Sequence, residues 1–251
     1  MEIIAHRGVH SKKEEENTLR AFSRAVATGC TMLELDVRRT KDNQLIVAHD
    51  PSFFFRGHEI FINHHNLDYL LDSGLVMNRV LLADDAKFKI PTIQLVLKFF
   101  LHRIKINIEL KDPYSSLLLG ETMDHLIKNS RLQQENLKQI IVSSFLPDEL
   151  LLFRKAYPDI PLALLLGVYS SAIFLPRKWV KWLKQNNIEA VHLSHRTATQ
   201  RTIVFFKDRG FKVRVYVVND LEALPFYQAC EVDGIFTDRP GEFMKVLGQK
   251  A

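Results

Sequence analysis

Short apolar segments alternate with stretches of helical periodicity along most of the chain. The apolar segments have the length of buried strands and occupy residues 2–6, 31–37, 104–110, 139–145, 161–168, 189–194, 212–218 and 232–237. Apolar residues recur at helical spacing in residues 17–29, 92–102, 115–130, 148–157, 177–186, 199–210 and 220–230. Continuously apolar strands that are separated by helices indicate parallel pairing with both faces buried. The pattern therefore predicts an α/β fold, a (β/α)8 TIM barrel.

One further apolar segment, residues 45–50, follows the second predicted strand too closely for a helix to intervene. The residues between them, 40–43, read Thr-Lys-Asp-Asn, which is typical of a turn. We therefore predict a hairpin that rises above the barrel from the second strand and returns antiparallel. Pairing about this turn brings His49 back beside Glu34 and Asp36.

Residues 51–90 contain aromatic residues and a histidine pair but no sustained period. We expect them to form a small inserted segment after the second strand, a lid or subdomain over the barrel mouth, within a single domain of residues 1–251. The run Phe53–Phe55 fits either burial in this insert or an exposed apolar lip for a lipid-like group.

The composition restricts the classes of partner. A chain of 251 residues that is 47% hydrophobic is long enough for one large core. The formal net charge of +5 favours anionic ligands, but Lys and Arg are interleaved with acidic residues, which argues against nucleic-acid binding. The longest uncharged stretch, residues 161–176, is shorter than the roughly 20 residues that a membrane-spanning helix needs. We expect no transmembrane segment; the oligomeric state is left open.

Cysteine content and the position of the first strand bear on localisation. Cys30 and Cys230 are too few for a disulfide framework and fit small buried side chains in a reducing compartment. The first predicted strand starts directly after Met1, which leaves no room for a cleavable signal segment. A cytoplasmic location is therefore expected.

Three carboxylates fall at the ends of neighbouring predicted strands. Glu34 and Asp36 stand two residues apart, so both leave the same face of their strand, and Glu109 ends the next barrel strand. Such an oxygen-only ligand set suits Mg²⁺ or Ca²⁺, whereas zinc favours nitrogen and sulfur. The alternative is a structural strand end whose acids form salt bridges with Arg38 or Lys111.

His6 and His49 are the candidates for acid–base catalysis. Imidazole has an ordinary pKa near 6.5 and can donate or accept a proton at neutral pH. Single histidines at strand ends are often structural, but two histidines brought beside the same carboxylates favour a paired role. One would remove a proton from the nucleophile while the other protonates the leaving oxygen.

Other polar residues are candidates for substrate binding. Arg7 and Lys111 could hold a phosphate, or could balance the charge of the acidic cluster. Asn17 could cap the first helix or hydrogen-bond a ligand. Tyr216 lies on a late strand and could face the pocket.

An ordered set of motifs runs along nearly the whole chain, at residues 6–8, 16–18, 34–37, 40–50, 89–92, 108–111, 142–145 and 234–240. In these motifs the chain resembles the glycerophosphodiester phosphodiesterase family. The resemblance implies a barrel with an insert after the second strand and a divalent metal held by Glu34, Asp36 and Glu109. It also implies His6 and His49 as general acid and base. Arg7 and Lys111 match positions that contact phosphate.

The sequence departs from the family pattern in three places. Glu16 stands where members usually have proline, Tyr216 stands where they usually have tryptophan, and the insert keeps only Arg56 of a threonine-rich pattern. The lost proline affects loop rigidity, whereas tyrosine for tryptophan would reshape the pocket wall. We therefore expect the preference for the leaving alcohol to differ.

The expected activity is metal-dependent hydrolysis of a small-molecule glycerophosphodiester to glycerol 3-phosphate and an alcohol such as choline or ethanolamine. Attack by the vicinal glycerol hydroxyl through a cyclic phosphate, and direct attack by water, use the same residues. Two alternatives remain at this stage. One is lysophospholipase D activity on an acylated substrate, and the other is a non-catalytic phosphate-binding barrel.

Overall fold

The computed structural model describes residues 1–11, 15–55, 57–74, 76–77, 90–168 and 176–248. Within these residues, parallel strands pair in the order β1-β13-β12-β11-β10-β9-β8-β2, and β1 also pairs with β2, which closes the barrel. The barrel strands are β1 (Glu2–Ala5), β2 (Met32–Arg39), β8 (Lys105–Leu110), β9 (Ile140–Ser144), β10 (Leu162–Leu166), β11 (Ala190–Ser194), β12 (Lys212–Tyr216) and β13 (Gly234–Thr237). The predicted TIM barrel is confirmed.

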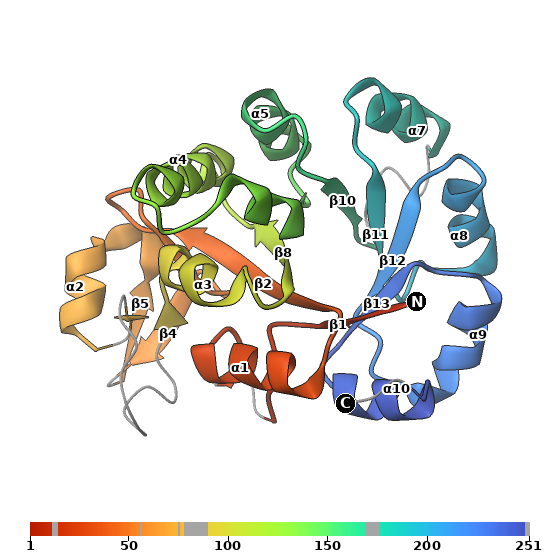
Figure 1. The fold of residues 1–251 in the computed structure, drawn as a ribbon, viewed down its shortest axis with the longest axis horizontal. Coiled ribbons are helices and arrows are strands. Elements are labelled where there is room, and N and C mark those ends of the chain that lie inside the picture. The colour runs from red at the N-terminus through yellow and green to blue at the C-terminus, as the bar shows by residue number, and fades with distance from the viewer. Residues whose placement is uncertain (12–14, 56, 75, 78–89, 169–175, 249–251) are drawn as a thin grey trace.

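Helices surround the barrel on its outside (Figure 1). They are α1 (Leu19–Thr28), α3 (Ile93–Phe100), α4 (Ser115–Lys128), α5 (Pro147–Ala156), α7 (Pro176–Gln185), α8 (Gln200–Lys207), α9 (Leu224–Ala229) and α10 (Pro240–Val246), with 3₁₀ turns η4 (Gln134–Gln139) and η5 (Leu221–Ala223). The apolar pattern did not predict α10. Its 7 residues make only about two turns, too few for a helical period to be recognised.

Alternation along the strands separates the outer core from the barrel interior. On β1, Ile3 and Ala5 pack into the large cluster formed with the helices, whereas Ile4 packs with Met32 and Phe236 in a separate apolar cluster. Side chains two apart on a strand share a face. Glu34 and Asp36 therefore continue the inward face of Met32 towards the carboxyl end of β2.

The predicted hairpin after the second strand is confirmed. Strand β3 (Leu45–Val47) pairs antiparallel with β2, with Val37 opposite Val47 and Arg39 opposite Leu45. The turn closes through a hydrogen bond from the backbone N–H of Asn43 to the carbonyl of Thr40. After β3 the chain has returned to the level of Asp36, whose carbonyl accepts from the backbone N–H of Ala48.

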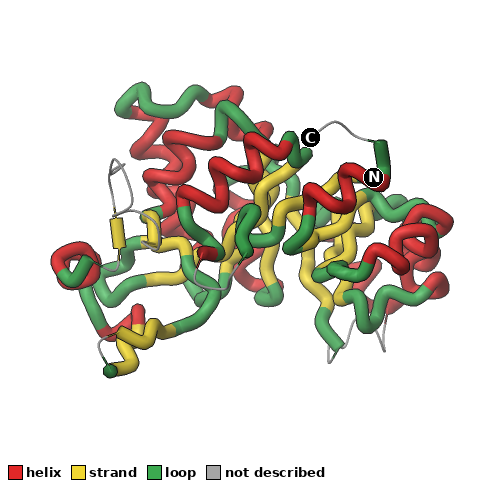
Figure 2. The backbone as a smooth tube through the Cα atoms, turned by 90° about the horizontal axis from the view of Figure 1, so that it is seen from below, coloured by secondary structure: helices red, strands yellow, loops and turns green. Residues whose placement is uncertain are grey.

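The insert of residues 51–90 contains short elements on one side of the barrel (Figures 1 and 2). They are the hairpin β4 (Ser52–Phe55) and β5 (His58–Phe61), η2 (Ile62–His64), α2 (Leu67–Asp72), β6 (Val76–Met77) and β7 (Ile90–Pro91). Phe53 packs on a small apolar cluster that includes Ile62 and Leu70, whereas Phe54 is 81% exposed. Of the two interpretations of the Phe53–Phe55 run, packing within the insert thus applies to Phe53, whereas exposure to solvent applies to Phe54. The side chain of Phe55, and Arg56, lie outside the described residues.

The described part of the chain contains no helix that is long and apolar enough to cross a membrane. The uncharged stretch 161–176 contributes the buried strand β10, as expected, while residues 169–175 lie outside the description. Cys30 and Cys230 are both buried, free thiols.

Gly8 lets the loop after β1 lie directly against α1. It has φ +87°, and a Cβ at this position would stand 2.7 Å from the Cβ of Ala21. The next residue, Val9, donates its backbone N–H to the carbonyl of Ala21. Any side chain at residue 8 would therefore push the loop that carries His6 and Arg7 away from α1.

Gly8→Ala should lower the free energy of unfolding by about 2–4 kcal/mol, because left-handed strain and steric overlap with α1 add together. The matched control is Gly210→Ala. Gly210 has φ +85° but no heavy atom within 4 Å of its added Cβ, so only the strain of about 1–2 kcal/mol applies. Urea unfolding of both variants measures the difference, and equal losses would contradict the close packing of Gly8 on α1.

Candidate active site

The three predicted carboxylates meet at the carboxyl ends of β2 and β8. The two strands pair in parallel with Asp36 opposite Glu109, and Glu34 lies one inward-facing position before Asp36. Ligand oxygens of Glu34, Asp36 and Glu109 all lie within 4.8 Å of one another, and all three residues are buried. The register of two neighbouring strands therefore concentrates three acids in one small volume.

Burial and mutual repulsion decide the charge of this cluster. Burial, together with the charges of Asp36 and Glu109, raises the pKa of Glu34 well above its usual value. Burial and Asp36 raise the pKa of Glu109 to about 7. Burial also opposes the ionisation of Asp36, but Lys111 and Arg7 outweigh it and lower the pKa of Asp36. Without a metal, Glu34 and Glu109 thus tend to keep their protons near neutral pH, whereas Asp36 is ionised.

Lys111 and Arg7 supply the positive charge against these acids. The Nζ of Lys111 lies 2.7 Å from Glu109 Oε1 and 3.3 Å from Asp36 Oδ1. The Nε of Arg7 lies 3.1 Å from Asp36 Oδ2, and its backbone N–H donates to Glu34 Oε2 at 2.8 Å. Both residues are therefore part of the acidic cluster.

Arg38, the other cation considered for these acids, pairs elsewhere. Its Nη1 lies 2.6 Å from Asp112 Oδ1, and its Nε donates to the carbonyl of His49 at 2.7 Å. Lys111 thus makes the salt bridges that were expected if the acids form a structural strand end. Arg38 instead hydrogen-bonds the backbone just after β3.

The acidic cluster fits a divalent metal ion. All its ligand atoms are carboxylate oxygens that lie within 4.8 Å of one another, and the buried Asp36 Oδ1 has Lys111 Nζ 3.3 Å away but no hydrogen bond among the described residues. Three buried carboxylates against the two cations Lys111 and Arg7 leave negative charge that a divalent ion can offset. Glu34, Asp36 and Glu109 could therefore hold a metal.

Asn17 belongs to the site and does not cap the first helix. Its Nδ2 donates to Asp36 Oδ2 at 3.0 Å. The cap of α1 is Thr18, whose hydroxyl accepts from the backbone N–H of Ala21. Asn17 has φ +58° and Arg7 has φ +53°, so two residues of the cluster occupy the left-handed region that non-glycine residues rarely adopt.

His6 and His49 both face carboxylates through Nδ1. His6 Nδ1 lies 2.6 Å from Asp238 Oδ1, and His49 Nδ1 lies 2.8 Å from Asp50 Oδ1. No hydrogen bond among the described residues engages the Nε2 of either ring. Burial and the charge of Lys111 lower the pKa of His49, which keeps this imidazole neutral near pH 7.

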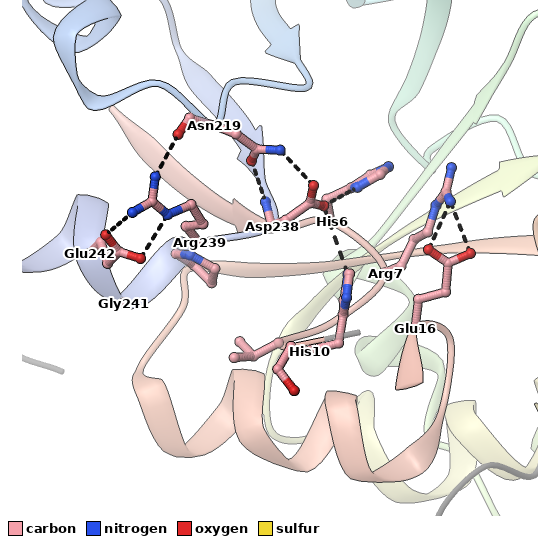
Figure 3. Close-up of a pocket in the computed structure, with 12 residues that line it drawn as sticks. His6, Arg7, His10, Glu16, Asn219, Asp238, Arg239, Gly241 and Glu242 are labelled. Carbon is pink, nitrogen blue, oxygen red and sulfur yellow. Dashed lines mark hydrogen bonds and ion pairs between the residues drawn. The ribbon is translucent and has the colours of Figure 1, made fainter. Parts of the chain in front are cut away.

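A cavity of about 760 Å³ lies beside His6 (Figure 3). It is lined by residues from the loop after β1, the loop after β12 and the start of α10, among them His6, Arg7, His10, Asn219, Asp238 and Arg239. Sequence analysis assigned no role to His10, Asn219 or Asp238. The signal for Asp238 was present, since it directly follows the last barrel strand as His6 directly follows the first.

Tyr216 forms an aromatic pair at the barrel mouth. Its ring makes an edge-to-face contact with Phe145, with centroids 6.0 Å apart. Burial and the charge of Glu109 raise the pKa of Tyr216, which places the phenol near the acidic cluster and keeps it neutral. Phe145, for which sequence analysis gave no role, is 44% exposed at the end of β9.

The chain matches the model of the glycerophosphoryl diester phosphodiesterase family over residues 6–242. Putative glycerophosphodiester phosphodiesterase YhdW of Bacillus subtilis is 31% identical over 255 residues, which cover 98% of this chain and 97% of that protein. A glycerophosphodiester phosphodiesterase of Caldanaerobacter subterraneus is 28% identical over 251 residues, with 98% and 97% covered.

Solved structures share the fold. An Oleispira antarctica phosphodiesterase in complex with the product sn-glycerol-3-phosphate superposes with a TM-score of 0.80 at 20% identity, covering 99% of this chain and 97% of that chain. The family match extends from His6 in the loop after β1 to Glu242 in α10 and so includes every residue of the acidic cluster. The chain belongs to the glycerophosphoryl diester phosphodiesterase family.

Proposed function

We propose that this protein is a metal-dependent enzyme that hydrolyses glycerophosphodiesters to glycerol 3-phosphate and an alcohol. The observation that carries the proposal is the cluster of three buried carboxylates with Lys111 and Arg7 at the mouth of a barrel of this family. His6 directly precedes Arg7, and His49 lies close enough to Lys111 and Asp36 for their charges to act on it. Such enzymes need fixed positive charge for a phosphate, and groups that exchange protons on both sides of the phosphorus. These residues provide both.

Arg7 and Lys111 are the proposed phosphate ligands. Their charges already face the acidic cluster, and the surrounding acids raise the pKa of both side chains although burial acts in the opposite direction. Both therefore stay cationic at any working pH. A phosphate bound beside them would receive charge-assisted hydrogen bonds from Arg7 and a point charge from Lys111.

Glu34, Asp36 and Glu109 are the proposed ligands of Mg²⁺ or Ca²⁺. Both ions prefer carboxylate oxygens, which is the donor set present. When bound, such an ion polarises a phosphate oxygen and lowers the pKa of a coordinated hydroxyl. Asn17 holds Asp36 in place through its amide.

His6 and His49 are the proposed proton-exchanging residues. Each offers Nε2 while its Nδ1 is held by a carboxylate. One ring takes the proton of the attacking hydroxyl or water, and the other gives a proton to the leaving oxygen. Their roles exchange if a cyclic phosphate is first formed and then opened by water.

Tyr216 and Phe145 are the proposed wall for the leaving alcohol. Their rings form one edge-to-face pair at the mouth. Aromatic faces attract organic cations by electrostatic interaction with the ring quadrupole. A cationic alcohol such as choline therefore suits this wall.

The direct test is release of glycerol 3-phosphate from glycerophosphocholine and glycerophosphoethanolamine, assayed with Mg²⁺, Ca²⁺ or a chelator. We expect release with metal and none with chelator. Lysophosphatidylcholine tests the alternative substrate, since Phe54 and Phe61 on the exposed face of the β4–β5 hairpin would suit an acyl chain. With that substrate the products would be lysophosphatidic acid and choline, so choline release is measured there. No release of glycerol 3-phosphate from either glycerophosphodiester would contradict the proposal.

His6→Ala and His49→Ala should each lower kcat by about a hundredfold to ten-thousandfold, because each removes one proton-transfer step. The affinity for metal should change by less than about threefold, since neither ring is a proposed metal ligand. Steady-state kinetics and metal titration by calorimetry check the two parts. A near-normal kcat in either variant would remove that histidine from the mechanism.

Glu34→Gln and Glu109→Gln should each weaken metal binding by at least about tenfold, because a neutral amide replaces a carboxylate ligand. The control is Glu222→Gln, an exposed acid of η5, which should bind metal as the parent does. Calorimetric titration with Mg²⁺ and Ca²⁺ measures both. An unchanged affinity in the first two variants would contradict the ligand assignment.

Metal affinity should fall as the pH is lowered through neutrality. The pKa of Glu109 in the metal-free protein is raised to about 7, so below this pH a bound proton must leave before the metal can bind. We expect affinity to drop by at least about tenfold between pH 8 and pH 6. Proton release, measured by titration in buffers of different ionisation enthalpy, should rise over the same range, and a flat profile would oppose the assignment.

A further inference from the structure

His6 and Asp238 are joined by the closure of the barrel. Strands β1 and β13 pair in register with Ala5 opposite Thr237, so the next residue of each strand emerges at the same level. The two side chains meet there, with His6 Nδ1 and Asp238 Oδ1 2.6 Å apart (Figure 3). The contact spans 232 residues of sequence, and Asp238 lies outside the proposed metal and phosphate ligands.

We propose that Asp238 is a positioning residue for His6, which it holds in the tautomer that carries the proton on Nδ1, leaving Nε2 to exchange protons with the substrate. The proton exchange rests on the proposed function, whereas the tautomer does not.

Asn219 fixes the orientation of the Asp238 carboxylate. Its Oδ1 accepts from the backbone N–H of Asp238 at 2.9 Å and from the hydroxyl of Thr237 at 3.1 Å. Because these two donors determine which end of the amide is oxygen, Nδ2 faces Asp238 and donates to Oδ2 at 2.6 Å. One carboxylate oxygen is thus engaged by Asn219, and the other faces His6.

Asp238 stays ionised. Burial alone would raise its pKa, but the hydrogen bond and charge of His6, with the hydrogen bond from Asn219, lower it to about 2. An ionised carboxylate only accepts hydrogen bonds, so the group that faces it must donate. The Nδ1 of His6 therefore carries a proton, and in the neutral ring Nε2 presents a lone pair.

His10 approaches the same carboxylate without competing for it. Its Nε2 lies 3.8 Å from Asp238 Oδ1, beyond hydrogen-bond distance. Of these two histidines, His6 alone is within hydrogen-bond distance of Asp238 Oδ1.

This arrangement serves both directions of proton transfer. In one, the O–H bond of the attacking group breaks as an N–H bond forms at Nε2, and the imidazolium is stabilised by the charge of Asp238. In the other, the proton on Nε2 passes to an oxygen and the ring returns to the same neutral tautomer. Nδ1 keeps its proton throughout.

Asp238→Asn tests the proposal, because the new amide has only one orientation that satisfies its neighbours. Asn219 Nδ2 still donates, so the amide oxygen faces Asn219 and the amide NH₂ faces His6. Nδ1 must then accept, and the proton moves to Nε2. The ¹⁵N chemical shifts of labelled histidine in the resting protein, with His6 assigned from its absence in His6→Ala, should show this exchange of tautomers.

The same variant should lower kcat by about a hundredfold to ten-thousandfold while KM stays within about threefold, because proton transfer fails and binding does not. The control is Glu242→Gln, which removes a carboxylate from the same cavity where it contacts Arg239 and not His6. It should leave both the His6 tautomer and kcat unchanged.

The double variant Asp238→Asn/Asn219→Asp exchanges amide and carboxylate at constant charge. The carboxylate at 219 now accepts from the amide NH₂, so the amide oxygen turns to His6 and Nδ1 regains its proton. We expect the original tautomer to return and kcat to recover by at least about tenfold over Asp238→Asn. A purely structural role of Asp238 predicts no such recovery.

Two results would overturn the inference. One is a His6 that keeps its proton on Nδ1 in Asp238→Asn, and the other is a double variant that recovers neither tautomer nor kcat. The tautomer is measured without substrate, so it decides the positioning role independently of whether the preparation hydrolyses glycerophosphodiesters.

Discussion

The burial of three carboxylates within one small volume is the constraint around which the mouth of this barrel is organised. Removing one ionised carboxylate from water already costs several kcal/mol, and Glu34, Asp36 and Glu109 are buried together. Lys111 and Arg7 offset part of this cost for Asp36, while the pKa of Glu109 rises to about 7. A cluster that is only partly neutralised by its own chain is suited to an added cation. The proposed divalent metal would favour the ionised form of all three carboxylates.

The scaffold delivers these groups by simple rules of strand geometry. On β2 the inward face runs from apolar Met32 through Glu34 to Asp36, so the change from core to active site takes place within one strand. Parallel register with β8 adds Glu109, and the antiparallel β3 returns the chain to His49. Because the barrel closes by pairing of β13 with β1, the residues that follow these strands, Asp238 and His6, come into contact. The precision of the site thus comes from the sheet, and the loops add single groups to it.

Most of the fold and much of the site were predictable from sequence because they depend on local patterns. Apolar periodicity gave the barrel strands within two residues or so of their observed bounds. The two-residue spacing of Glu34 and Asp36 predicted that both leave the same face of their strand. The four-residue turn after that strand predicted that the chain returns His49 beside them.

Contacts between distant segments were not predictable in this way. Asn17 and Thr18 are both good caps, and only the packing of the loop on Asp36 decides that Thr18 caps the helix. The bond between His6 and Asp238 requires knowledge that β1 and β13 are neighbours with a particular register. In the insert, the neighbouring residues Phe53 and Phe54 meet opposite environments because they alternate across a two-stranded sheet.

The central claim is that the buried acids form a metal site, and the most direct test is a crystal structure of the protein soaked with Mn²⁺, which occupies oxygen-rich magnesium and calcium sites and scatters anomalously. The account predicts one strong anomalous peak within about 2.5 Å of oxygens from Glu34, Asp36 and Glu109. It also predicts that Lys111 moves away from at least one of the two carboxylates that it contacts in the absence of metal. A fully soaked crystal without a peak in this cluster, and with Lys111 still bound to both carboxylates, would contradict it.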